Sequence, residues 1–167
     1  MRRNAQGFTL IELIVVITVL GILASIALPR FIGVQRDARI SKLLALNGSI
    51  RAASSLAHAR CLLDQAATPV GACLPTVASV VSMEGVNNIV TINSYPQAIA
   101  GGIIAAAQLD AATDGLTISG GGAGAAQLIT VDLTGATAPA TCRISYTSPA
   151  AAAGSAPVIL PPLTAGC

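Results

Sequence analysis

The stretch GFTLIELIVVITVLGILASIALP at residues 7–29 decides the fold of this chain. Residues 8–28 form an apolar run in which Glu12 is the single charged residue. At a rise of about 1.5 Å per residue, a helix of this length is about as long as a bilayer core is thick. Arg2 and Arg3 precede the run, and this placement of positive charge predicts an N-terminus that stays in the cytoplasm.

A secretory signal and a plain membrane anchor are two common explanations for an apolar N-terminal segment. A secretory signal has an apolar region of only about 7–15 residues, which ends at a small-x-small cleavage site. Here Ala-Ser-Ile-Ala at residues 24–27 is followed by more helix-compatible sequence. A plain membrane anchor is the second alternative. Neither explains Glu12, because a carboxylate inside an apolar span is costly unless it finds a partner.

Glu12 gains such a partner if the chain is cut between Gly7 and Phe8. The new α-amino group of Phe8 is then a cation about one helical turn from the carboxylate. In a bundle of such helices, Glu12 of one subunit can neutralise the amine of a neighbour and thereby set the axial register. Snorkelling of Glu12 to the membrane interface is the alternative explanation.

The GFTLIEL motif at residues 7–13 resembles the cleavage and methylation motif of type IV prepilins, and the similarity continues to residue 29. The resemblance implies that residues 1–7 are a leader and that a prepilin peptidase cuts between Gly7 and Phe8. It implies N-methylation of Phe8, with Glu12 as the carboxylate that guides assembly. Residues 8–29 are then the transmembrane and filament-core helix.

Gly21 and Pro29 are expected to loosen this helix. Pro29 has no N–H and crowds the carbonyl of Ser25, so a bend is expected there. Gly21 weakens a helix by about 1 kcal/mol relative to Ala. Pilin filaments are similar in having a locally melted segment in this interval, so Gly21 and Pro29 are predicted to give the helix flexibility during assembly.

Residues 30–65 predict a continuing, amphipathic helix. Apolar residues at spacings of three and four form one stripe: Ile40, Leu43, Leu46, Ile50, Ala53, Ala57 and Cys61. The other side is expected to carry Arg36, Arg39, Lys42 and Ser54. His58 lies beside the stripe and is predicted to be a packing or surface residue. Thr-Pro-Val-Gly at residues 68–71 ends the helical pattern.

Residues 66–167 predict a small globular head. Short apolar runs between turn residues indicate strands at 88–92, 116–119, 127–133 and 142–147. Pro96 is expected to open a helix that continues to Ala107. The predicted fold class is therefore α+β: a long N-terminal helix packed on a small antiparallel sheet.

The four cysteines of the chain, Cys61, Cys73, Cys142 and Cys167, predict two disulfides if the chain is exported. Three connectivities are possible. We favour Cys61 with Cys73 and Cys142 with Cys167, because each pair brackets a loop that contains Gly and Pro. The spacing contains no C-x-x-C pair and there is one histidine, which argues against a zinc site.

The C-terminal part of the head extends the resemblance. The tail bounded by Cys142 and Cys167 resembles the pilin D-region, a disulfide-closed loop exposed on the filament. Tyr95-Pro96 before a Gly/Ala-rich segment, the pattern Cys142-x-Ile-x-Tyr146 and the terminal Gly-Cys resemble the mannose-sensitive haemagglutinin subgroup of type IVa major pilins.

The remaining motifs do not indicate an enzyme, a metal or a cofactor. Gly-Gly-Gly-Ala-Gly at residues 120–124 lacks the Lys-Ser/Thr of a phosphate loop. Asp110, Asp114 and Asp132 lack the spacing of a calcium loop and are expected to be solvated. One histidine and scattered serines do not assemble a nucleophile, a base and an orienting group.

The sequence therefore predicts a major structural subunit of a type IV pilus that mediates adhesion, surface motility or both. The expected partners are identical subunits, a prepilin peptidase, the pilus assembly machinery and, before assembly, the bacterial inner membrane. The final location is an extracellular pilus. With a net charge of +2, no nucleic acid is expected. Alternatives are a pseudopilin of a type II secretion system, a minor or DNA-uptake pilin, and a membrane-tethered periplasmic binding domain.

Overall fold

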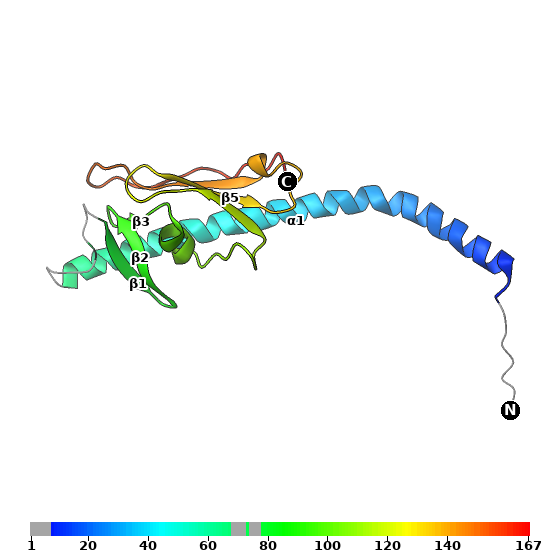
Figure 1. Cartoon of the computed structure of the whole chain (residues 1–167), viewed down its shortest axis with the longest axis horizontal. Helices are drawn as coiled ribbons and strands as arrows, with labels where there is room; N and C mark the ends of the chain where they lie inside the picture. Colours follow the sequence, from blue (N-terminus) through cyan, green and yellow to red (C-terminus); the bar gives the residue numbers. More distant parts are fainter. Residues whose placement is uncertain (1–7, 68–72, 74–77) are drawn as a thin grey trace, which may run out of the picture. The chain divides into compact units, whose positions relative to one another are not determined.

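The computed structural model describes residues 8–67, 73 and 78–167. The chain divides into two compact units, the first ending at Ala38 and the second running from Arg39 to Cys167. A single helix, α1 (Leu10–Ala67), begins in the first unit and ends in the second (Figure 1). Pro29 lies inside α1, and the helix is not interrupted there. The N-terminal part of α1 is long and apolar enough to cross a membrane.

The first unit has an apolar surface that the described residues of that unit leave exposed. The large apolar side chains described between residues 8 and 31 have exposed fractions from 47% at Ile14 to 80% at Phe8. An uninterrupted apolar surface of this length is unfavourable in water. It is therefore suited to an apolar environment.

The amphipathic stripe predicted for the second half of α1 is confirmed. Leu43, Ile50, Ala57 and Cys61 are almost fully buried, and Ala53 is buried as well. Ile40 and Leu46 are partly buried against the same core. The expectation that Ser54 faces away was wrong, since this side chain is only 3% exposed. Ser54 follows Ile50 by four positions and precedes Ala57 by three, so the helical repeat places it on the stripe.

The second unit contains two antiparallel sheets instead of the single predicted one. The first has three strands: β1 (Ser79–Met83), β2 (Val86–Ile92) and β3 (Tyr95–Pro96). The second has four strands in the order of the chain: β4 (Leu116–Gly120), β5 (Leu128–Leu133), β6 (Arg143–Thr147) and β7 (Val158–Ile159). The four predicted strands are present as β2, β4, β5 and β6. The fold is the α+β fold of a pilin, with a long N-terminal helix and a disulfide-closed C-terminal region.

Each sheet covers a different length of α1 and has its own core. Leu43 and Ile50 pack with side chains of the four-stranded sheet, including Ile129, Val131 and Ile144. Further along the helix, Ala53 and Ala57 pack with Val81 and Ile89 of the three-stranded sheet. The alternation of buried and exposed residues along β5 and β6 follows from this one-sided packing.

The segment that joins the two sheets corrects the prediction for Pro96. Pro96 does not open a helix: it belongs to β3, where it pairs with Thr91. The short helix η1 (Ala100–Ile104) begins four residues later and contains a non-helical residue, Gly102. The buried side chain of Gln97 joins the two sheets, since its amide donates to the carbonyl of Thr91 at 3.1 Å and accepts from the N–H of Gly124 at 3.0 Å.

Candidate functional site

The start of α1 is held by a reciprocal cap between Thr9 and Glu12. Thr9 donates its backbone N–H to Glu12 Oε2 at 3.0 Å and its hydroxyl to the same oxygen at 2.7 Å. The backbone N–H of Glu12 in turn donates to the Thr9 hydroxyl at 3.4 Å. This is the arrangement of a capping box, in which residues three apart satisfy N–H groups that the first helical turn leaves free.

The cap gives Glu12 a defined orientation at the exposed end of the helix. Both Thr9 donors reach one oxygen, Oε2, which leaves Oε1 for a donor from another molecule. Phe8 and Glu12 line the same shallow hollow, of about 360 Å³, with Ile11, Val15 and Val16. The structure thus brings the predicted amine-bearing residue and the predicted assembly carboxylate to one face. Gly7, the other predicted cleavage residue, lies outside the described residues.

The two hydroxyl groups further along the apolar run are satisfied within the helix. Thr18 donates to the carbonyl of Val15 at 2.9 Å, and Ser25 donates to that of Ile22 at 2.7 Å. Because a polar group without a partner is costly in an apolar environment, these bonds suit the run to lipid or to a filament core. Glu12 is then the charged side chain of the run, and its Oε1 remains available to a donor from another molecule.

Gly21 and Pro29 lie away from Glu12, at separate positions along α1. A Cβ added at Gly21 would meet no heavy atom within 4 Å, so packing within this chain does not require glycine there. The structure shows a continuous helix through both positions. Their predicted role in loosening the helix during assembly remains a prediction.

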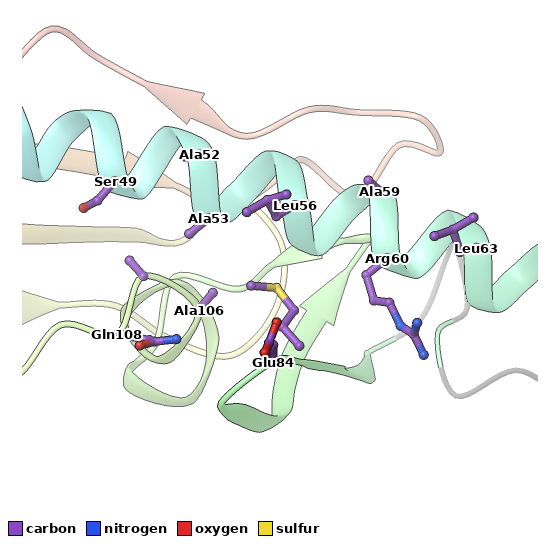
Figure 2. A pocket seen from close by; sticks show the side chains of 12 residues that line it. Ser49, Ala52, Ala53, Leu56, Ala59, Arg60, Leu63, Glu84, Ala106 and Gln108 are labelled. Atoms are coloured by element: carbon purple, nitrogen blue, oxygen red, sulfur yellow. The ribbon is translucent and has the colours of Figure 1, made fainter.

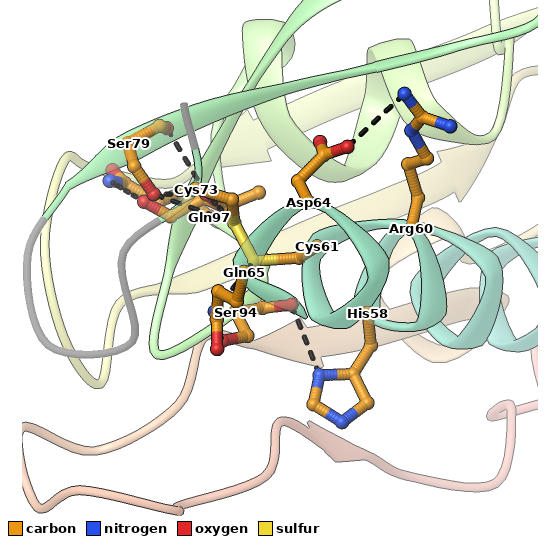
Figure 3. The surroundings of a disulfide bond; sticks show 10 residues. His58, Arg60, Cys61, Asp64, Gln65, Cys73, Ser79, Ser94 and Gln97 are labelled. Carbon is orange, nitrogen blue, oxygen red and sulfur yellow. Dashed lines mark hydrogen bonds and ion pairs between the residues drawn. A yellow bond between two sulfur atoms is a disulfide. The ribbon is translucent and has the colours of Figure 1, made fainter. Parts of the chain in front are cut away.

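The structure forms both disulfides in the favoured pairing. Cys61 bonds to Cys73 with a Cα–Cα distance of 5.4 Å, and Cys142 bonds to Cys167 with one of 4.9 Å. The first bridge ties the end of α1 to the chain before β1 (Figure 3). The second closes the C-terminal segment, whose backbone also pairs with the head between Arg143 and Leu163.

The end of α1 near the first bridge is fixed by contacts to the β2–β3 turn. His58 Nδ1 lies 3.2 Å from the carbonyl of Ser94, and its ring stacks on Tyr95 with a centroid distance of 3.9 Å. Gln65 donates to the Ser94 hydroxyl at 2.9 Å. Figure 3 shows His58, Gln65 and Ser94 around the bridge. His58 is therefore a packing residue, as predicted.

The three aspartates considered for calcium are engaged in separate local interactions. Asp110 accepts the backbone N–H groups of Thr113 and Ala112, and these bonds hold its pKa below the usual value. Asp114 accepts the N–H of Asp110, while Asp132 pairs with Arg143 at 2.9 Å. Within the described residues, no group of three metal-ligating side chains comes together.

Thr9 is not among the site residues predicted from the sequence, although it holds the Glu12 carboxylate. Thr-x-x-Glu at residues 9–12 directly precedes an apolar helix and is itself the sequence pattern of a capping box. The same residues form the cleavage and assembly motif, and that motif by itself does not indicate a link between Thr9 and Glu12.

Comparison with known proteins finds a known motif at the N-terminus and similarity to fimbrial proteins over part of the chain. Residues 2–28 match the model of the prokaryotic N-terminal methylation motif. The chain is 38% identical over 64 residues to a type IV major fimbrial protein FimA of Dichelobacter nodosus, a match that covers 38% of each chain. It is 43% identical over 54 residues to PilA5, a type IV narrow pilus major component of Thermus thermophilus, covering 32% of this chain and 47% of that one.

A longer match is to the fimbrial protein EcpC of Eikenella corrodens. The identity is 32% over 90 residues, which is 54% of this chain and 56% of that protein. The matched regions thus span about two fifths to just over half the length of these relatives. No solved structure matches the chain. The chain thus carries the N-terminal methylation motif, an apolar helix and a disulfide-closed head, and it is similar to type IV major fimbrial proteins over part of its length.

Proposed function

We propose that this chain is the major subunit of a type IV pilus, made as an inner-membrane precursor and assembled into an extracellular filament. A prepilin peptidase removes residues 1–7 and N-methylates Phe8. The assembly machinery then extracts the subunit into a polymer of identical copies. The polymer acts in adhesion, surface motility or both, and the subunit itself catalyses no reaction.

The observation that carries this proposal is the exposed apolar helix with one oriented carboxylate. Every large apolar side chain described between residues 8 and 31 is at least 47% exposed, so this surface needs a partner over its whole length. Lipid provides one before assembly, and neighbouring copies of the helix provide one in a filament.

Glu12 distinguishes a filament helix from a simple anchor. In lipid a charged side chain at this position is energetically unfavourable, and a simple membrane anchor gains nothing from it. In a bundle, its free oxygen Oε1 can accept the amine of Phe8 from a neighbouring copy. The low dielectric of the bundle makes this pair stronger than one in water. The pair therefore favours one axial register over others.

Filament assembly by Glu12 variants tests the proposal. Cells that express Glu12→Gln or Glu12→Ala as the sole subunit are expected to process the precursor and to hold it in the membrane fraction. Sheared filaments should be strongly reduced, because the amine of Phe8 loses its counter-charge. Thr18→Val is the matched control, since it removes a polar group from the same run without removing a charge. Normal filament yield from Glu12→Gln would contradict the role of the carboxylate.

A further inference from the structure

The head has an apolar groove beside α1 that none of the described residues fills. The groove has a volume of about 630 Å³. Leu56 and Leu63 line it from α1, and Ala106 lines it from the opposite wall (Figure 2). Met83 of β1 also lines the groove. Leu56 is 61% exposed and Leu63 is 63% exposed. More than half of each leucine side chain is therefore exposed, so the groove presents apolar area to a partner.

A second uncovered apolar surface lies on the C-terminal segment. Val158 is 53% exposed, Leu160 is 54% exposed and Leu163 is 51% exposed. We call these three residues the tail patch. Residues 144–167 contain no Asp, Glu, Lys or Arg, so the tail patch has no charged side chain of its own segment around it.

The groove and the tail patch lie on opposite flanks of α1. The tail is held by Asn47, which donates to the carbonyl of Leu160, and by Arg51, which donates to that of Ile159 at 2.7 Å. The groove residues Leu56 and Arg60 each follow one of these two residues by nine positions. Nine residues are roughly two and a half turns of an α-helix, so the two pairs of side chains point in opposite directions.

Two unlike patches on opposite flanks determine what kind of assembly can cover both. A twofold dimer buries the same patch on both partners and leaves the other patch exposed. A contact between the groove of one copy and the tail patch of the next covers both kinds of surface. A contact between unlike surfaces of this kind is also the one that an open helical polymer requires.

The charged residues that line the groove are compatible with this contact. Arg60, at the edge of the groove, is paired with Asp64 at 3.1 Å, which leaves Glu84 as the remaining charged residue that lines the groove. An uncharged tail brings no like charge toward Glu84 and leaves the Arg60–Asp64 pair in place.

We propose that the groove lined by Leu56, Leu63 and Met83 receives residues 158–163 of a second copy of this chain. This contact joins neighbouring heads along the polymer. The inference rests on the proposed function, because it assigns a head-to-head contact to the filament subunit. It adds a specific pair of surfaces to the association of the apolar helices.

Cross-linking between engineered cysteines in sheared filaments tests the contact. Leu56→Cys combined with Leu160→Cys is expected to give a ladder of dimers and higher oligomers on non-reducing gels after mild oxidation. Peptide mapping should place the link between positions 56 and 160 of different copies. Neither single variant should give a disulfide-linked dimer, because neither position meets itself across a heterologous contact.

A matched pair controls for chance collisions on the filament surface. Leu62→Cys with Leu160→Cys uses a leucine that is also exposed, at 48%, but does not line the groove. This pair should give no ladder. A disulfide-linked dimer from either single variant would show a twofold contact and overturn the proposal, as would intact filaments in which the first pair fails to cross-link. A failure of the unmodified chain to form filaments would instead overturn the proposed function.

Discussion

Thr9 donates both its backbone N–H and its hydroxyl to the same carboxylate oxygen of Glu12, at 3.0 and 2.7 Å. The only charged side chain of the apolar run is thus fixed by the residue that caps the helix. A fixed carboxylate loses less conformational freedom when it binds an amine than a freely rotating one does. The cap therefore prepares Glu12 for a partner as well as starting the helix.

Removal of the Thr9 hydroxyl is expected to weaken filament assembly without preventing processing. In Thr9→Val, Glu12 keeps its charge but loses its shortest bond, and loss of such a cap costs about 1 kcal/mol. Thr9→Ser retains the hydroxyl and should assemble normally. The ratio of sheared to cell-associated protein measures the effect. Equal ratios for Thr9→Val and Thr9→Ser would show that the cap plays no part in assembly.

Tyr146 is expected to make the head sensitive to alkaline pH. Its side chain is 1% exposed, and its hydroxyl donates to the carbonyl of Pro96 at 2.6 Å. Burial raises the pKa of Tyr146 well above its usual value. In the unfolded chain, the Tyr146 hydroxyl titrates near its ordinary pKa of about 10. Because the pKa is higher in the folded state, the contribution of Tyr146 to the stability of the head is fully present below about pH 10. This stabilisation is lost as the pH rises further.

Tyr146→Phe tests this expectation in the detergent-solubilised full chain. At neutral pH the variant should be less stable by about 1–3 kcal/mol, because the buried carbonyl of Pro96 loses its donor. Between pH 9 and about 12, the melting temperature of the variant should fall less than that of the unmodified chain. Parallel pH profiles would mean that Tyr146 does not contribute to the alkaline loss.

Gly102 and Gly101 offer a matched pair for the connection between the sheets. A Cβ at Gly102 would collide with the backbone carbonyl of Gln97, whereas one at Gly101 would make only ordinary contact with Val90, at 3.8 Å. Gly102→Ala is expected to destabilise the head by about 1–3 kcal/mol. Gly101→Ala should be neutral or slightly stabilising. Thermal unfolding of the full chain compares the two, and equal effects would contradict the close approach.

Loss of the bridge between Cys142 and Cys167 is expected to release the C-terminal segment. The bridge closes a loop with a sequence separation of 25 residues, for which chain entropy gives a stabilisation of roughly 3.5 kcal/mol. Cys142→Ser combined with Cys167→Ser should lower the melting temperature and make residues 158–163 accessible to protease. Unchanged proteolysis of this segment would mean that side-chain bonds hold it without the bridge: Arg39 donates to the carbonyl of Cys167 at 3.0 Å, and Asn47 and Arg51 donate to those of Leu160 and Ile159.

The long helix and its packing could be predicted from the sequence because their patterns extend over many residues. The apolar run at residues 8–28 and the stripe from Ile40 to Cys61 each repeat over several turns, so single exceptions do not hide them. Four strands were predicted to within two residues of their observed ends for the same reason.

The division into two sheets depends on features that local patterns do not contain. β3 and β7 have two residues each, too few for any alternation to be detected. Pro96 has the same local appearance at a helix start and at a strand edge, and its pairing with Thr91 decides between them. The bond from Gly124 to Gln97 joins residues 27 positions apart, so no short window of sequence predicts it.

The mass of intact protein sheared from the cell surface tests the central claim most directly. If the chain is a processed pilin, one dominant species should lack residues 1–7, carry one additional methyl group and lack the four cysteine hydrogens that two disulfides remove. Such a species in an abundant surface fraction is what the account predicts. A chain that stays in the membrane fraction with Met1 to Gly7 attached would contradict it and would indicate a tethered domain.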